Sequence, residues 1–85
     1  MPVSNTNIVE RVARVIAGRV ASINAEGSDP SAGDWVDNNW RDFREEALSV
    51  LRTLREPDPA MAGAGDLDIW QRMIEAALAE AGEGA

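Results

Sequence analysis

The side chains that could do chemistry in this sequence are almost all carboxylates. The 85-residue chain has 15 acidic residues against eight basic ones, all arginine, and it contains no histidine, lysine or cysteine. Two carboxylates can share acid–base work when their surroundings separate their pKa values, but no pair here stands with a nucleophile and an orienting group. The missing residue types also exclude Cys/His zinc sites, disulfides, thiol nucleophiles and lysine Schiff bases. We therefore expect no enzymatic activity and no cofactor.

Two stretches have the composition of a ligand-binding loop. The acids between residues 26 and 37 carry oxygens that a hard cation prefers, but their spacing does not fit a calcium loop. Gly63 and Gly65 are similar to a fragment of a phosphate loop, but no strand pattern precedes them and no lysine follows them. We expect a solvated loop in the first stretch, a helix connection in the second, and no metal site.

Charge and hydropathy narrow the class of protein further. A net charge of −7 opposes binding to nucleic-acid phosphates. No apolar run approaches the roughly 18 residues that a membrane span needs, and the first residues lack the basic and apolar segments of a signal peptide. The hydrophobic content of 45% is that of a folded chain. We expect one small cytoplasmic domain that binds neither nucleic acid nor membrane.

Apolar residues recur at helical spacing in three segments, and none alternates as a strand would. The pattern predicts helices at about 7–25, 35–55 and 67–81, a loop at about 25–34, and a short helical turn near 58–62. Three amphipathic helices with short connections favour an all-α fold, a compact three-helix bundle. The expected core is Ile8, Val12, Val15, Ile16, Ile23, Val36, Trp40, Phe43, Ala47, Val50, Leu51, Leu54, Trp70, Met73, Ile74, Ala77 and Leu78.

Polar residues stand where each helical segment begins. Asn7 and Glu10 have the spacing of a capping box, in which each side chain bonds to the other residue's backbone N–H. Asp34 is expected to cap the second helix, Asp58 the short turn and Asp66 the last helix.

Arg19 falls near the middle of the apolar face that Val12, Ile16 and Ile23 form on a helical wheel. A bare buried charge is costly, which leaves three interpretations. The guanidinium reaches solvent with its stem packed, it pairs with an acid of residues 29–37, or it faces a partner chain.

Three large apolar residues lie about 100° or more from the centre of their own apolar faces, namely Trp35, Leu48 and Ile69. Scattered exposed apolar residues are ordinary, but three in so small a chain also fit an interface. For Trp35, a loop folded back over the ring would instead make it part of the core.

Dense acids allow two interpretations. They form a soluble acidic surface, or they imitate the phosphates of a nucleic acid and so block a protein that binds one. If the acids bind a partner protein, those expected to contact it are Asp29, Asp34, Asp37, Asp42, Glu45 and Glu46.

Three stretches resemble small phage and prophage proteins of unknown function. The opening motif of those proteins, IERVARAI, is similar to IVERVARVI at residues 8–16. Their centre, ARAALEALREP, is similar to ALSVLRTLREP at residues 47–57, and their close, WRAMIDAAL, to WQRMIEAAL at residues 70–78. Residues 24–40 have no counterpart in that pattern. The family has no established activity, so the resemblance transfers no catalytic residue and implies only a mobile-element context.

That context implies a non-enzymatic phage accessory protein that binds and inhibits a host protein, for example a bacterial defence complex of the CRISPR–Cas type. Docking would be steric or through the acidic surface. The alternative is a homo-oligomeric structural or interaction protein, with Arg19, Leu48 or Ile69 in the shared surface.

Overall fold

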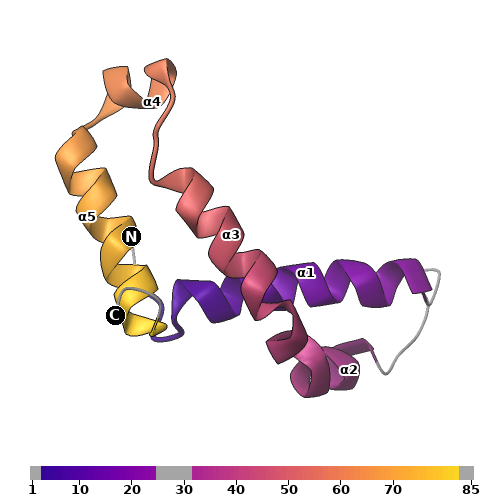
Figure 1. Ribbon diagram of the computed structural model, residues 1–85. Helices are drawn as coiled ribbons and strands as arrows, with labels where there is room; N and C mark the ends of the chain where they lie inside the picture. Colours follow the sequence, from indigo (N-terminus) through magenta and orange to yellow (C-terminus); the bar gives the residue numbers. More distant parts are fainter. Residues whose placement is uncertain (1–2, 25–31, 83–85) are drawn as a thin grey trace.

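The computed structural model describes residues 3–24 and 32–82 of the chain. All regular structure in these residues is helical, which confirms the all-α fold. Its elements are α1 (Ile8–Asn24), α2 (Ala32–Asn39), the 3₁₀-helix η1 (Trp40–Phe43), α3 (Arg44–Leu54), α4 (Pro59–Ala64) and α5 (Leu67–Glu80), as Figure 1 shows.

The chain bends where one continuous helix was predicted over residues 35–55. The backbone tightens into η1 after Asn39, whose φ of −125° and ψ of −6° leave the α-helical region. Phe43, with φ of −105° and ψ of 10°, separates η1 from α3 in the same way. The sequence indicated that Asp34 would be the residue before this helix and would cap it. Helix α2 instead begins at Ala32, so Asp34 lies in its first turn.

Side-chain caps begin three of the helices as predicted. The backbone N–H of Val9 donates to Oδ1 of Asn7 at 2.7 Å. Asp58 accepts from the N–H of Met61 at 2.9 Å, and Asp66 accepts from the N–H of Ile69 at 3.0 Å. The expected turn near 58–62 is therefore the short helix α4.

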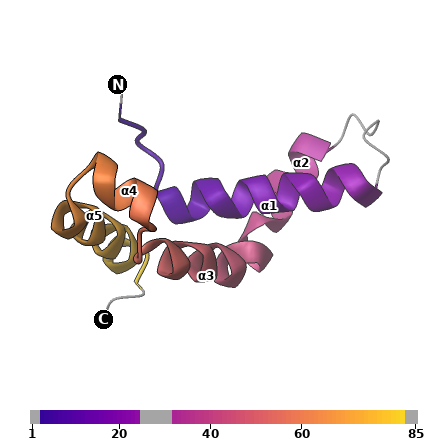
Figure 2. The same ribbon diagram turned by 90° about the horizontal axis from the view of Figure 1, so that it is seen from above.

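Three long helices meet at one core. Helix α1 crosses α3, and α5 packs against α3 and the start of α1 (Figures 1 and 2). The buried residues of this core are Val9 and Ala13 of α1, Ala47, Leu48 and Leu51 of α3, and Ile74 and Leu78 of α5.

Helix α1 buries its bulky face only in part: Ile8 and Val12 pack against the core as expected but are partly buried. Its buried stripe is Val9, Ala13, Ala17 and Ala21, at steps of four residues. Small side chains let α2, η1 and α3 approach the axis of α1 closely, which the branched side chains would prevent. Val15, expected in the core, is 66% exposed on the opposite side.

Three further residues expected in the core are exposed, namely Val50, Leu54 and Met73. Leu48, expected off the apolar face and at an interface, is instead 1% exposed. Helix α3 contacts both α1 and α5, so its buried face is set by two neighbours and includes Leu48 beside Ala47 and Leu51. The side chain of Ile23, also expected in the core, lies outside the described residues.

The mutual contacts of α1, α3 and α5 are consistent with the expected three-helix bundle, which is elongated in outline. The Cα radius of gyration is 15.0 Å, against about 12 Å for a compact domain of this length. Helices α3 and α5 lie beside each other, and α4 connects the end of α3 to the start of α5 (Figure 1). Among the described helices, none is long and apolar enough to cross a membrane.

Candidate functional site

Arg14 links α1 to the start of the bent segment. Its Nε lies 2.8 Å from Oε2 of Glu10, one turn earlier on α1, and its Nη1 lies 2.7 Å from Oδ1 of Asp37 on α2. These hydrogen bonds, to Asp37 first and Glu10 second, raise the pKa of the Arg14 guanidinium above its usual value. Glu10 thus serves an ion pair and not the capping box that its spacing predicted, and Asp37 is occupied within the fold.

Aromatic rings hold the corner where α2 turns into η1. The guanidinium carbon of Arg14 lies 5.4 Å from the ring centroid of Trp40, and that of Arg41 lies 4.7 Å away, both within cation–π range. Trp35 packs against Phe43 with ring centroids 6.1 Å apart and planes tilted by 55°. Trp35 is half-buried, and the ring it packs against, Phe43, belongs to the same bent segment.

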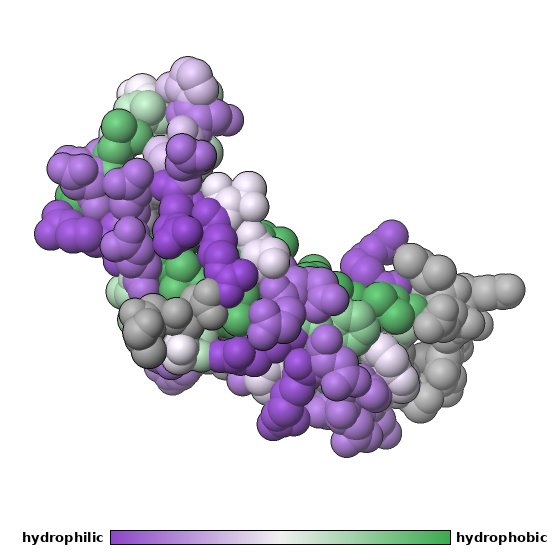
Figure 3. All heavy atoms as spheres, viewed as in Figure 1, coloured by the Kyte–Doolittle hydropathy of each residue, from purple (hydrophilic) through white to green (hydrophobic). Residues whose placement is uncertain are grey.

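An acidic outer face lies on the solvent side of this corner. We define it by Asp42, Glu45 and Glu46, which are all exposed. Glu45 and Glu46 lie three and four residues after Asp42, so they share its side of the helix. Within the part of the chain that the structure describes, none of the three forms an ion pair. Asp34 is also exposed, on α2, and Figure 3 shows hydrophilic residues over α2 and the start of α3. Asp29, the sixth expected acid, lies outside the described residues.

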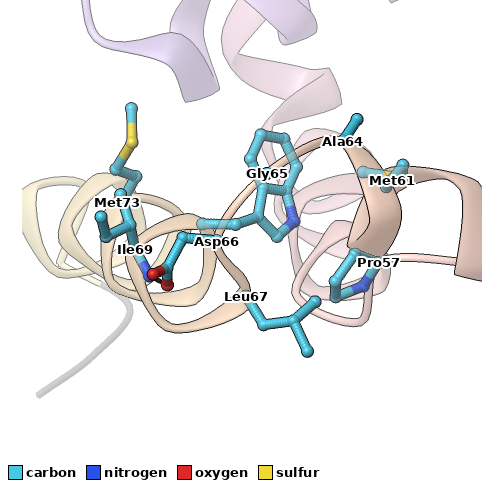
Figure 4. A pocket seen from close by; sticks show the side chains of 9 residues that line it. Pro57, Met61, Ala64, Gly65, Asp66, Leu67, Ile69 and Met73 are labelled. Carbon is cyan, nitrogen blue, oxygen red and sulfur yellow. Dashed lines mark hydrogen bonds between the residues drawn. The ribbon is translucent and has the colours of Figure 1, made fainter.

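An apolar groove lies between α4 and α5. It has a volume of about 360 Å³ and is lined mainly by apolar side chains. Met61 and Ala64 come from α4, and Ile69 and Met73 come from α5 on the other side (Figure 4). Figure 3 shows apolar residues at the surface where these two helices meet. Ile69, selected from the sequence as an off-face residue, is exposed in this groove.

The groove has a fixed inner wall. The indole of Trp70 lines it, and its Nε1–H donates to the backbone carbonyl of Leu54 at 2.6 Å. This bond ties α5 to the last turn of α3. At the other end of α5, Arg44 of α3 donates to the backbone carbonyl of Ala81. The two anchors hold the α3–α5 pair, while Met61 and Met73 give the outer wall an adaptable surface.

Arg19 does not occupy the position that its helical wheel indicated. Because α1 buries its alanine stripe, Arg19 is exposed. Of the acids between residues 29 and 37 that were expected as its internal partner, Asp37 bonds to Arg14, and no ion pair joins Arg19 to Asp34.

The acidic outer face and the apolar groove are the two surfaces from which a function can be argued. No group of three or more acids converges as a metal site in residues 3–24 and 32–82. The sequence had indicated the acidic outer face, because charges on the far side of an amphipathic helix face solvent. It had indicated the groove only through Ile69, because the other lining residues were assigned to the core or to connections. Comparison with protein families, characterised proteins and solved structures yields no match to this chain.

Proposed function

We propose that this chain is a non-enzymatic protein-binding module whose acidic outer face docks on a basic surface of a partner protein. The observation that carries the proposal is the exposure of three carboxylates, on Asp42, Glu45 and Glu46, without an ion pair in the described part of the chain. Their charges are therefore available to arginine or lysine side chains of a partner, unlike the charge of Asp37.

The position of this face favours recognition. The three acids lie in η1 and the first turn of α3, beside the corner that Trp40 and the Arg14–Asp37 ion pair hold in place. A preorganised face loses little conformational freedom on binding. Charge complementarity of this kind mainly raises the rate of association and selects against partners of the same sign. The same charge disfavours direct contact with nucleic-acid phosphates.

The partner class follows from the resemblance to phage and prophage proteins. A small accessory protein from such a source would bind a protein of the bacterial host, and a nucleic-acid-binding defence complex carries the basic surfaces that this face fits. Bound there, the module would inhibit by covering the surface or by occupying the place of phosphates.

The test uses two variants with equal net charge. In the face variant Asp42→Asn, Glu45→Gln and Glu46→Gln neutralise the acidic outer face. The control variant neutralises three exposed acids elsewhere on the chain, through Glu56→Gln, Glu75→Gln and Glu80→Gln. Each immobilised protein is exposed to extract of the host bacterium, and bound proteins are quantified by mass spectrometry.

We expect a specific protein that is retained by the wild type and the control and lost from the face variant. Equal retention by all three proteins would show that the acidic outer face is not the docking surface. Retention of nothing specific by the wild type would contradict the binding function itself.

The alternative role, self-association, would need an exposed apolar surface, which the chain offers in the groove between α4 and α5.

A further inference from the structure

The apolar groove between α4 and α5 adjoins an acidic surface. Asp66 is one of the residues that line the groove, and Figure 4 shows its carboxylate among the apolar side chains. A second depression lies next to the groove, since Pro57 and Leu67 line both. Glu56 and Asp58 line this second depression. Among the residues that the structure describes, no arginine lines either one, so an apolar surface and an acidic one meet here.

The three carboxylates of these linings carry charges that a partner can reach. Glu56, Asp58 and Asp66 are exposed, and none of them forms an ion pair with another described residue. Asp58 and Asp66 each accept one backbone N–H bond, as the caps of α4 and α5. A carboxylate has a full negative charge, whereas a helix N-terminus has a positive charge of only about half a unit. The surroundings of the groove are therefore negative.

Charge distinguishes between the possible occupants of the groove. Residues 56–73 contain four acids, namely Glu56, Asp58, Asp66 and Asp68, against the single base Arg72. Arg72 donates to the backbone carbonyl of Asp68 at 3.4 Å and lines neither depression. A second copy of this segment would bring like charges together, whereas a cationic partner would bring opposite charges together.

The groove also exposes the apolar side chains that an interface needs. Ile69 and Met73 lie one turn apart on α5 and form a ridge, and Met61 of α4 stands on the other side (Figure 4). All three are exposed. The volume of about 360 Å³ is near the lower limit of small-molecule pockets, roughly 300–1,000 Å³, so a few side chains would fill it. A third helix can supply them by packing its own ridge between α4 and α5.

We propose that the groove binds an amphipathic helix of a partner protein, with large apolar side chains on one face and arginine or lysine beside them. The apolar side chains occupy the space between α4 and α5, which is a general mode of helix recognition. The basic side chains pair with Asp66 in the groove and with Asp58 in the adjoining depression. The acidic outer face on η1 and α3 takes no part, so the inference does not rest on the proposed function.

The test uses a synthetic peptide of about 18 residues, long enough to form a helix, with leucine along one face and lysine beside it. One control peptide has glutamate in place of every lysine, and another has alanine in place of every leucine. Each peptide carries fluorescein, and fluorescence anisotropy measures its binding to the purified chain. We expect saturable binding of the leucine–lysine peptide that added salt weakens, and binding of both controls that is weaker by about tenfold. No binding of the leucine–lysine peptide, or equal binding of either control, overturns the proposal.

The contribution of charge is tested by a groove variant, Asp58→Asn with Asp66→Asn. Asparagine caps a helix about as well as aspartate does, so α4 and α5 should be retained. The matched control, Asp42→Asn with Glu46→Gln, neutralises two acids of the acidic outer face. We expect the groove variant to bind the leucine–lysine peptide about fivefold more weakly and the control to bind it like the wild type. An equal loss in both would show that the peptide responds only to net charge, and would overturn the proposal.

The contribution of the apolar wall is tested by Met73→Gln. Val15→Gln is the matched control, because Val15 is as exposed as Met73 but lies on α1, outside the groove. Far-UV circular dichroism verifies that each variant retains its helices. We expect Met73→Gln to weaken peptide binding by about fivefold and Val15→Gln to leave it unchanged. A Met73→Gln variant that binds as tightly as the control contradicts the proposal.

Amide chemical shifts of the isotope-labelled chain locate the bound peptide. We expect the largest changes at Met61, Ile69 and Met73. Changes confined to η1 and the first turn of α3 would place the peptide on the acidic outer face, which overturns this inference and leaves the proposed function standing. If the groove residues instead shift when the chain is concentrated without peptide, the groove binds a second copy, which also overturns the inference.

Discussion

The indole N–H of Trp70 donates a 2.6 Å hydrogen bond to the backbone carbonyl of Leu54 and so joins the start of α5 to the end of α3. The carbonyls in the last turn of a helix have no partner within the helix, so this bond satisfies one that would otherwise need water. It also fixes one wall of the groove, because the same indole lines it. One wall of the groove between α4 and α5 is thus held in place by Trp70, which also packs against the core as the sequence predicted.

Replacing Trp70 with Phe should lower the free energy of unfolding. The change removes the hydrogen bond to Leu54, a loss of about 0.5–1.5 kcal/mol, plus part of the indole's contact area. Trp35→Phe is the control, since the indole of Trp35 packs on Phe43 without such a bond. Urea unfolding followed by circular dichroism gives both values, and equal destabilisation would show that the Trp70 bond contributes nothing of its own.

Leu48 should be among the most sensitive positions in the chain. Among the side chains that the structure describes, Leu48 and Leu51 are the largest that are less than 2% exposed. Leu48→Ala should cost about 2–5 kcal/mol by leaving a cavity, while Leu67→Ala, at a residue 45% exposed, should stay within about 0.5 kcal/mol. Denaturant midpoints compare them. If Leu48→Ala destabilises the protein no more than Leu67→Ala, Leu48 lies at the surface, as the sequence indicated.

Two glycines should respond in opposite directions to alanine. Gly18 lies within α1 with open space around the site of a Cβ, so Gly18→Ala should stabilise by roughly 0.5–1 kcal/mol. That gain corresponds to a rise in Tm of a few degrees in a domain of this size. Gly82 has a φ of +87° after the end of α5, so Gly82→Ala should destabilise by about 1–2 kcal/mol. Calorimetric Tm values of the two variants should therefore lie on opposite sides of the wild type.

The orientation of α1 can be tested at two neighbouring positions. Ala13 has no exposed surface where α1 packs on α3, so Ala13→Leu should force the helices apart and cost about 1–3 kcal/mol. Val15→Leu, on the exposed side, should be neutral. Chemical unfolding distinguishes the orientations, because an α1 that buried its bulky face would show the reverse order of sensitivity.

Local features of the fold were predictable from the sequence. Helix caps depend on a few adjacent residues, so Asn7, Asp58 and Asp66 begin helices as expected. The three long helical segments follow from hydrophobic periodicity and from the Gly and Pro residues between them. The bend at η1 was missed, because residues 40–43 fit the α-helical pattern of their neighbours and the tightening depends on packing against α1.

The choice of buried face was not predictable by the same means. Helix α1 has two apolar sides, a bulky one that includes Val12 and Ile16 and a small one formed by Ala13, Ala17 and Ala21. A periodicity argument weights the larger side chains by their transfer free energy. The separation of crossing helices instead depends on the size of the residues at the crossing. The sequence of one helix does not specify which of its residues lie where another helix crosses it. The error for Arg19 has the same origin.

The candidate surfaces were predictable to different extents. Exposed acids on α3 follow from the polar side of an amphipathic helix, and they are found there. Asp37 belonged to the same set and is also exposed, but its carboxylate is paired with Arg14, 23 residues away in the sequence. The groove depends on how α4 is placed beside α5, so Met73 was assigned to a core that does not enclose it.

The most direct measurement for the acidic outer face is the association rate of the retained host protein with the wild type and the two charge-matched variants at low and high salt. Electrostatic docking predicts that added salt slows the association of the wild type and of the control to the same extent. The face variant should associate slowly at both salt concentrations, and its association rate should depend less on salt. If the face variant associates as fast as the control and responds to salt equally, the acidic outer face does not guide binding.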